Sequence, residues 1–422
     1  MDPEDRTPET EEAGDETKRI SVAHRRELRS YLGASGRKHG RFDVPMFLLT
    51  VILLTFGVVM VLSASYVRAY YSSEGSATNY FVRQLIFAVL GVFLMVFVSY
   101  IKIDVFRRLS LPLLGVSVAM LALVPIIGET ENGATRWINL GFTTFQPSEI
   151  TKLALIMAYA VLICNYRNRM KTFKYGVLPF AIVAAVVVGL LVLEPHYSAS
   201  IIVIAITLFM MFMGGTRTVY FVAGFLLVAA AGFLVYKTVD YVAVRIDTWR
   251  HPFDYPQGDG WQTIQSLYAV GSGGFLGLGL GQSRQKFLWL PEEHNDFIFS
   301  VVCEELGFLG AALILILFAM LIIRGFWIAV HAKDRYSALV AAGISGLLAI
   351  QVILNVAVVT NLVPCTGISL PFFSYGGTAL LIQLFEIGIV LSVSREVETD
   401  APAVDPGDRE EPADRDGKEA ES

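Results

Sequence analysis

A cluster of acidic side chains and one histidine stands where a polar stretch turns into an apolar segment. Residues 289–310 have the sequence "WLPEEHNDFIFSVVCEELGFLG" and open with Glu292, Glu293, His294 and Asp296. Carboxylates crowded beside a medium of low dielectric constant push at least one pKa upward, which is what a general base needs. Asp296 is our candidate for that base. The alternative is an ordinary helix cap, because an Asp at a helix start accepts hydrogen bonds from backbone amides.

Two further carboxylates, Glu304 and Glu305, follow in the same apolar segment. Charged groups inside such a segment are costly unless they are paired or hydrogen-bonded. We therefore expect a buried, hydrogen-bonded pair that locks this segment to a neighbour, with a functional role as the alternative.

A second group of polar side chains precedes another apolar segment, in "GETENGATRWINLGFTTFQPSEITKLALI" at residues 128–156. Asn132 and Gly133 form a turn signal, and Arg136 and Trp137 place a cation and an amphipathic ring at the depth of the lipid headgroups. Trp137 taken alone is typical of an interfacial anchor.

The same stretch predicts a helix that starts at Pro147, with Glu149 on the positive end of its dipole and Lys152 three residues later on the same face. Charges at this depth are expensive unless they are paired or face water, so they indicate a functional site. A purely structural ion pair is the alternative.

A third irregular stretch is "NLVPCTGISLPFFSYGGTALL" at residues 361–381, in which Pro364, Pro371 and Gly376-Gly377 interrupt an apolar run. Non-helical backbone at membrane depth survives only where protein buries it or where it lines a watery cavity. We expect a re-entrant, non-helical element here rather than a simple helix kink.

These groups must be positioned by membrane-spanning helices. With 54% hydrophobic and 17% charged residues, the chain has too little polar surface for a soluble protein of 422 residues. Long apolar runs recur without the alternation of a β-barrel, so the sequence predicts an all-α polytopic membrane protein with about ten transmembrane helices. The predicted spans are 46–66, 83–101, 109–127, 149–165, 176–193, 198–214, 219–236, 297–323, 337–358 and 371–393.

The loops between the spans alternate in charge, which predicts the orientation. Lys and Arg accumulate in cytoplasmic loops. Such residues follow the second, fourth, sixth and eighth predicted spans: Lys102, Arg107, Arg108, Arg167, Arg169, Lys171, Lys174, Arg217, Arg324, Lys333 and Arg335. Both termini are therefore predicted to be cytoplasmic, and the three polar stretches above extracytoplasmic.

The regions outside the predicted spans are of two kinds. The tails at 1–44 and 396–422 are charged and predicted to be disordered, and the formal net charge of −5 comes largely from them. The large extracytoplasmic loop at 238–295, between the seventh and eighth spans, is predicted to be a folded cap with an amphipathic helix near 260–270. Its many glycines lack the lysine and the βαβ context of a nucleotide loop, so we expect tight turns and close approach to a lipid headgroup.

The motifs of this chain are similar to those of the SEDS family (shape, elongation, division and sporulation), which includes FtsW, RodA and SpoVE. The resemblance covers residues 45–395 and is nearest to the FtsW or SpoVE type. It is carried by "RQ" at 83–84, "GATRWINLG" at 133–141, "FQPSE" at 145–149, "YPQGDGWQTIQSLYAVGSGG" at 255–274, "GLGQSRQK", "LPEEHNDFIF" with "EELG", and "LPFFSYGG".

The resemblance implies a peptidoglycan glycosyltransferase of the bacterial cytoplasmic membrane that polymerises lipid II at the outer face during cell division. It also implies a class B penicillin-binding protein transpeptidase and divisome proteins as partners, with no nucleic acid. The essential Asp of the family's "HTDFIF" motif falls on Asp296. Asn295 stands where Thr is usual, and His196 in "LEPHYSAS" replaces the Asp of a Gln-Pro-Asp-x-Gly pattern.

On this basis we expect Asp296 to act as general base on the sugar hydroxyl. Arg136, Lys152 and Lys286 would hold pyrophosphate, and a divalent cation (Mg2+ or Mn2+) could share that work. Glu149 would orient Lys152. The remaining candidates for substrate contact are Trp137, His294 and Ser374. No protein-only metal site is predicted, and the three cysteines suggest neither a disulfide nor a zinc site.

Two other functions remain alternatives at this point. A lipid II flippase would need polar groups through the whole membrane depth. A non-catalytic divisome scaffold would tolerate the loss of Asp296.

Overall fold

The computed structural model describes residues 40, 42–72, 77–131, 134–139, 141, 143–238, 240–258 and 260–397. The tails predicted at 1–44 and 396–422 lie outside the described residues except at their inner edges, and so does the predicted turn at Asn132 and Gly133.

The described part of the chain is predominantly helical. The longer helices are α2 (Val44–Ser72), α3 (Asn79–Ser99), α4 (Ile103–Ile127), α5 (Pro147–Asn165), α7 (Leu178–Leu193), α8 (Tyr197–Gly214), α9 (Thr218–Thr238), α10 (Asp240–Arg250), α11 (Trp261–Ser272), α12 (Ile298–Val330), α13 (Arg335–Val359) and α14 (Gly377–Ser394). Short elements are η2 (Arg167–Arg169), α6 (Phe173–Gly176), η3 (Pro252–Asp254) and the strands β1 (Glu129–Glu131), β2 (Ala134–Asn139) and β3 (Thr144–Phe145).

Within the described residues, nine helices are long and apolar enough to cross a membrane, with α6 and α7 counted as one. They coincide with nine of the ten predicted spans. At the tenth, 219–236, α9 forms a helix of 21 residues, several of whose side chains lie outside the described set. The chain is thus an all-α polytopic membrane protein. Four predicted boundaries were wrong by six or seven residues: α2 continues to Ser72, α4 begins at Ile103, α12 continues to Val330, and the last helix begins at Gly377 rather than at 371.

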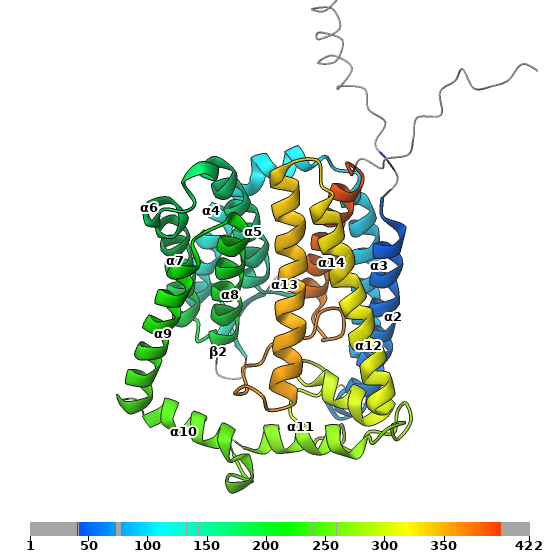
Figure 1. Cartoon of the computed structure of the whole chain (residues 1–422). Helices are drawn as coiled ribbons and strands as arrows, with labels where there is room; N and C mark the ends of the chain where they lie inside the picture. Colours follow the sequence, from blue (N-terminus) through cyan, green and yellow to red (C-terminus); the bar gives the residue numbers. More distant parts are fainter. Residues whose placement is uncertain are drawn as a thin grey trace, which may run out of the picture.

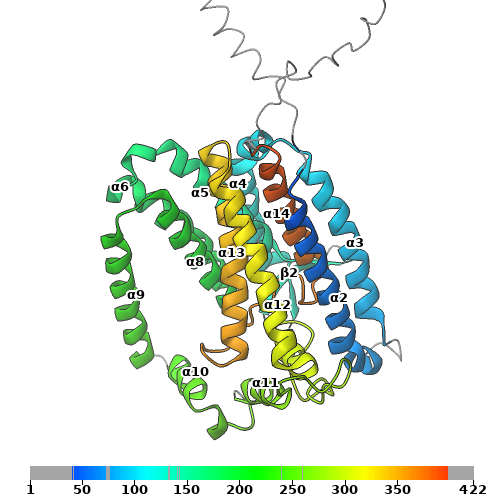
Figure 2. The same ribbon diagram turned by 45° about the vertical axis from the view of Figure 1, so that its right-hand side comes forward.

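The helices form a bundle in which α14 is central and packs against α3 and α13, while α4 packs against α5 and α12 against α2 and α13 (Figure 1). The two ends of the described chain meet at one end of the bundle, where the Gly40 amide donates to the Arg395 carbonyl. The opposite end, which carries α10 and α11, is called the outer end below, because the loop charges predict it to be extracytoplasmic. A view turned by 45° also places α9 at the edge of the bundle (Figure 2).

A small antiparallel sheet lies at the outer end, in the order β1-β2-β3. Ile138 on β2 pairs with Phe145 on β3, and α5 begins two residues later at Pro147. The prediction of a helix start at Pro147 is confirmed. The sheet was not predicted, although the turn signal followed by alternating residues at 134–139 is typical of a hairpin.

The loop between α11 and α12 inserts into a break in α12. Gly307 adopts φ +66, a value that only glycine tolerates readily, and its missing side chain leaves room for the backbone of Gly277. The amides of Leu278 and Gly279 donate to the carbonyls of Glu304 and Glu305. Gly277 and Gly307 thus allow this loop to approach α12 closely, and the positive φ of Gly277, Gly279 and Gly281 confirms the predicted tight turns. The approach to a lipid headgroup stays a prediction.

Glu304 and Glu305 form what we call the buried carboxylate cluster, together with Ser63, Ser283 and Lys286. Glu304 accepts hydrogen bonds from the Ser283 hydroxyl and the Arg284 amide, and Glu305 accepts from Ser63 and from the Lys286 ammonium at 2.9 Å. The prediction of a hydrogen-bonded pair that locks α12 to its neighbours is confirmed.

The segment between α13 and α14, residues 360–376, contains no helix. Leu370, Phe372 and Phe373 are fully buried in it, and the Phe372 amide donates to the Gln383 side chain on α14. The predicted re-entrant element is confirmed, and its backbone is buried in protein as its depth requires. The predicted amphipathic helix near 260–270 is also confirmed as α11.

Candidate active site

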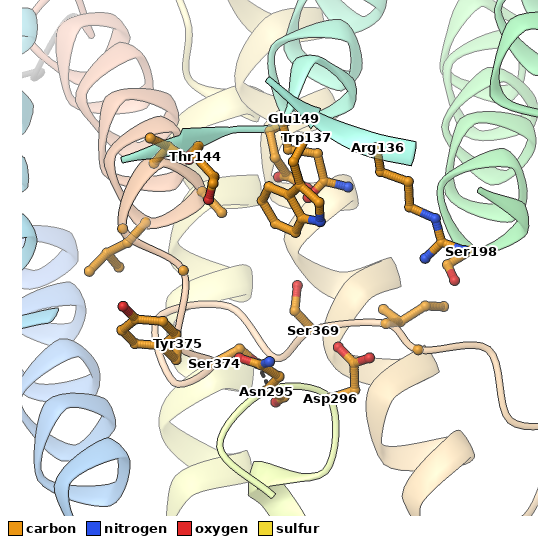
Figure 3. A pocket seen from close by; sticks show the side chains of 18 of the residues that line it. Arg136, Trp137, Thr144, Glu149, Ser198, Asn295, Asp296, Ser369, Ser374 and Tyr375 are labelled. Atoms are coloured by element: carbon orange, nitrogen blue, oxygen red, sulfur yellow. Dashed lines mark hydrogen bonds between the residues drawn. The ribbon is translucent and has the colours of Figure 1, made fainter. Parts of the chain in front are cut away.

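A cavity of about 1260 Å³ opens between the sheet, the re-entrant segment and the turn that precedes α12. Seven of the eight predicted site residues line it: Arg136, Trp137, Glu149, Lys152, His294, Ser374 and Asp296. Figure 3 shows Arg136 and Trp137 on one wall and Asn295, Asp296 and Ser374 on the facing wall. Residues far apart in the sequence are therefore gathered around one space.

Asp296 does not cap α12, so that alternative is wrong. The helix begins at Ile298 with Phe297 at the cap position and no side-chain capping bond. Among the described residues, no hydrogen bond reaches the Asp296 carboxylate, which faces the cavity (Figure 3). A carboxylate left without donors in a partly buried position retains its basicity for a ligand.

The surroundings of Asp296 raise its pKa to about 6. Burial is the largest cause and the negative charge of Glu292 adds to it, while Arg136 and His294 act in the opposite direction. At neutral pH the group remains mostly ionised and is a stronger base than an ordinary Asp. The prediction that crowded carboxylates raise a pKa is confirmed in part. The charge of Glu292 raises the pKa of Asp296, whereas Glu293 is not among the groups that raise it.

Gly367 leaves the space into which the Asp296 carboxylate projects. A Cβ built on this glycine would lie 2.9 Å from the Asp296 Oδ2 atom, and its backbone has φ +57. A side chain here would be both strained and crowded against the carboxylate.

The turn at 292–296 is held by the re-entrant segment and by α13. The Ser374 hydroxyl donates to the Asn295 carbonyl at 2.8 Å, and the Tyr375 amide donates to the His294 carbonyl. From α13, the Asn355 amide donates to two carbonyls, those of Asp296 and Ile368, at 2.8 and 2.6 Å. Ser374 therefore shapes the turn, whatever contact it makes with substrate.

Arg136 projects from β2 toward the turn between α7 and α8, where its guanidinium donates to the Pro195 carbonyl. Burial lowers its pKa, while the charges of Asp296 and Glu194 raise it. A guanidinium keeps its charge under these conditions, so Arg136 supplies a cation within the field of Asp296.

Lys152 and Glu149 form an ion pair of 2.8 Å on the first turns of α5. Lys152 is only 2% exposed, and both residues line the cavity. This is the orientation of Lys152 by Glu149 that the helical spacing predicted.

Glu194 and His196, on either side of Pro195, were not among the predicted site residues. Burial raises the pKa of Glu194 to about 7, against the effect of Arg136. Burial, Arg136 and Lys152 lower the pKa of His196 to about 3, so its ring is neutral, and its Nε2 lies 3.2 Å from the Gln146 Nε2. The sequence could have pointed to these two residues through its departure from the Gln-Pro-Asp pattern. Glu194 stands at the Gln position and His196 at the Asp position, so the acidic residue is at 194 instead of 196.

Lys286 does not line the cavity. The residue is 3% exposed, and its ammonium is hydrogen-bonded to Glu305 and Ser63 in the buried carboxylate cluster. The expectation that it would hold pyrophosphate is corrected, because a buried lysine paired in this way has no route to a ligand in the cavity.

No group of three or more His, Cys, Asp or Glu side chains among the described residues is arranged to hold a metal ion. Mg2+ is usually held by substrate phosphates and one or two carboxylates, which requires no such group.

Most of this membrane protein matches the model of a known protein family. The family model FTSW_RODA_SPOVE, described as a cell cycle protein, matches residues 44–399. The chain belongs to this family.

Similar proteins and solved structures agree with that assignment. The chain is 44% identical over 358 residues to a probable peptidoglycan glycosyltransferase FtsW of Trichlorobacter lovleyi, covering 84% of this chain and 93% of that protein. It is 41% identical to the stage V sporulation protein E of Bacillus subtilis, covering 84% and 97%. A chain of a solved peptidoglycan synthase complex matches with a TM-score of 0.71 at 29% identity, covering 85% and 99%. The rod shape determining protein RodA of Thermus thermophilus matches with a TM-score of 0.62 at 27% identity, covering 85% and 98%.

Proposed function

We propose that this chain is a peptidoglycan glycosyltransferase that polymerises lipid II at the outer face of the cytoplasmic membrane. One observation carries the proposal: the Asp296 carboxylate stands without hydrogen-bond donors among the described residues, in a cavity that also holds the cations Arg136 and Lys152. A base beside two anion-binding groups is the arrangement that sugar transfer from a pyrophosphate requires. The names of the relatives and the description "cell cycle protein" support a use in cell division.

In the proposed reaction, Asp296 accepts one proton. The 4-hydroxyl of an incoming GlcNAc loses its proton to the Asp296 carboxylate as its oxygen attacks the anomeric carbon of MurNAc. A new C–O bond forms, and the bond between that carbon and the pyrophosphate oxygen breaks. Because its pKa is raised to about 6, Asp296 accepts this proton more readily than an ordinary Asp would.

The leaving group is undecaprenyl pyrophosphate, which departs as an anion. Arg136 and Lys152 would stabilise its developing charge, and Glu149 holds Lys152 in place. Trp137 and the re-entrant segment would shape the cavity around the sugars. A divalent cation brought by the pyrophosphate could share the stabilisation, and loss of activity in EDTA that Mg2+ or Mn2+ restores would support its use.

We also propose a transpeptidase of the class B penicillin-binding type as partner, along with other divisome proteins. The match to a chain of a peptidoglycan synthase complex supports such a pairing.

The test is polymerisation of fluorescent lipid II in detergent by the purified protein with its transpeptidase, read as glycan products on a gel. We expect polymer from the wild type and none from Asp296→Ala. Equal product from both would defeat the proposal and favour a scaffold. Flipping cannot produce this signal, because detergent offers no second leaflet.

A further inference from the structure

Glu293 has a different environment from the other acidic residues of the turn at 292–296. Its carboxylate is fully buried, and Arg68 holds it through two parallel hydrogen bonds, from Nε at 2.8 Å and from Nη2 at 2.7 Å. Burial alone would raise the pKa of Glu293, but the attraction of His294 and Arg68 outweighs it, and the pKa is lowered. Glu293 is therefore ionised at neutral pH and is paired with Arg68.

The partner comes from a different part of the fold. Arg68 belongs to α2, close to its outer end, whereas Glu293 lies in the turn that precedes α12. The bidentate geometry fixes both the distance and the orientation of the two planar groups. The pair thereby connects a transmembrane helix to the turn three residues before Asp296.

The backbone of this turn needs such a connection. Glu292, directly before Glu293, adopts φ +54, which is unfavourable for a residue with a side chain. Strained backbone of this kind persists only where its surroundings over-determine it. Other hydrogen bonds to the turn, from Asn355, Ser374 and Tyr375, end on backbone carbonyls, so Arg68 and Glu293 supply a connection between two charged side chains.

We propose that Arg68 and Glu293 are positioning residues that hold the turn so that Asp296 faces the cavity. This inference rests on the proposed role of Asp296. Neither residue needs to touch the reacting atoms, although Arg68 also lines the cavity. A direct contact between Arg68 and substrate is the competing explanation, and the experiment separates the two.

The experiment measures kcat and KM of polymerisation for Arg68→Gln, Glu293→Gln and the double variant. Each single change should lower kcat on the order of tenfold with little change in KM, because either change removes the connection between α2 and the turn that carries Asp296. The double variant should be no slower than the slower single one, because both changes remove the same connection. Arg68→Lys, which keeps the charge but loses the fork, should fall between the wild type and Arg68→Gln.

The chain offers a matched control at the other end of α2. Arg324 binds Asp43 through Nε and Nη2, with an exposure of the arginine side chain of 31%, close to the 30% of Arg68. Asp43→Asn removes an ion pair between the same helix and α12, far from the cavity. It should leave kcat unchanged, so the loss of an ion pair between these two helices far from the cavity is distinguished from a loss of positioning at the turn.

The outcomes that oppose the inference are distinct. If Arg68→Gln raises KM and the two single effects multiply in the double variant, Arg68 acts on substrate directly. If both single variants keep the wild-type kcat while Asp296→Asn is inactive, only the positioning role fails. If Asp296→Asn is active, the proposed function fails as well.

A second measurement reads position without activity. In a background in which Cys164, Cys303 and Cys365 are replaced by Ala, Asp296→Cys is labelled with a small charged methanethiosulfonate. Adding Glu293→Gln should change the labelling rate severalfold, and adding Asp43→Asn should not. Equal rates in all three proteins would overturn the inference.

Discussion

Two sets of carboxylates on one segment differ in what surrounds them. Asp296 stands at the cavity wall without a hydrogen-bond donor among the described residues, and Glu304 and Glu305, eight and nine positions later, are almost wholly buried among donors from Ser63, Ser283 and Lys286. In the sequence they differ only in place, since Asp296 stands where the polar stretch ends and Glu304 and Glu305 lie inside the apolar segment. Their hydrogen-bond partners distinguish them in the structure. Donors that stabilise an ionised carboxylate lower its basicity, and Asp296, which has none among the described residues, remains the stronger base.

The difference has an energetic side. A buried ion pair with its hydrogen bonds satisfied gives a defined structure, and it is costly to break. A carboxylate held by its backbone alone can be changed with little loss of stability, but its chemistry then disappears. Substitutions in the two sets should therefore affect different measurements.

The largest effect is expected for Asp296→Asn. The amide keeps the shape of the side chain but cannot accept the proton, so polymerisation should fall by about 100-fold or more. The temperature of unfolding in detergent should stay within a few degrees of the wild type. A polymerisation rate near the wild type would mean that the carboxylate facing the cavity is no more reactive than those in the buried carboxylate cluster.

The opposite behaviour is expected for Glu305→Gln. It leaves the buried Lys286 ammonium without its counter-charge, which should lower the free energy of unfolding by about 3–5 kcal/mol. Denaturant titration of the detergent-solubilised protein measures this loss. Activity per folded molecule should remain, and Asp43→Asn, at a partly exposed pair, should cost less than about 1 kcal/mol.

A smaller effect on activity is expected for Gly367→Ala. The new methyl group would press on the Asp296 carboxylate, and a displacement near 1 Å can cost up to about 100-fold in rate. Gly215→Ala is the control, since Gly215 has a similar φ of +84 but open space around its Cβ position. If both variants lose activity equally, backbone strain rather than crowding at Asp296 is responsible.

The smallest expected effect concerns pH. Polymerisation should decline as the pH falls through about 6, because the base must be ionised and its pKa is raised to that value. Glu292→Gln removes a neighbouring negative charge that raises this pKa, so the declining limb should move to lower pH by less than about one unit. Arg136 and His294 act in the opposite direction, and replacing Arg136 should move the limb upward. Unchanged limbs in both variants would contradict the assignment of this titration to Asp296.

Much of the architecture could be predicted from the sequence because its causes are local. Apolar length determines the spans, and Pro147 with the spacing of Glu149 and Lys152 determines the start of α5. Pro364, Pro371 and Gly376 disfavour a helix before α14 begins at Gly377. The roles of Asp296 and Arg136 came from motifs whose order along the chain matched a family.

The rest depended on tertiary partners. The prediction that Lys286 would hold pyrophosphate failed because the sequence does not show which acid a lysine near an acidic cluster will pair with. Its partner, Glu305, lies 19 positions away. Glu293 was grouped with Asp296, since its partner Arg68 is 225 positions distant. The small sheet was missed because two- to six-residue strands leave a weak pattern beside long apolar runs.

One side chain sets a limit on how this cavity can deform. Because the Asn355 side-chain amide donates to the main-chain carbonyls of both Asp296 and Ile368, these two parts of the cavity lining are tied to one residue on α13. If neighbouring helices tilt, Asp296 and Ile368 should move together, and the distance between them should stay constant. Widening to admit a bulky substrate is therefore expected at the opposite side, where Arg136 on β2 contacts Pro195 between α7 and α8.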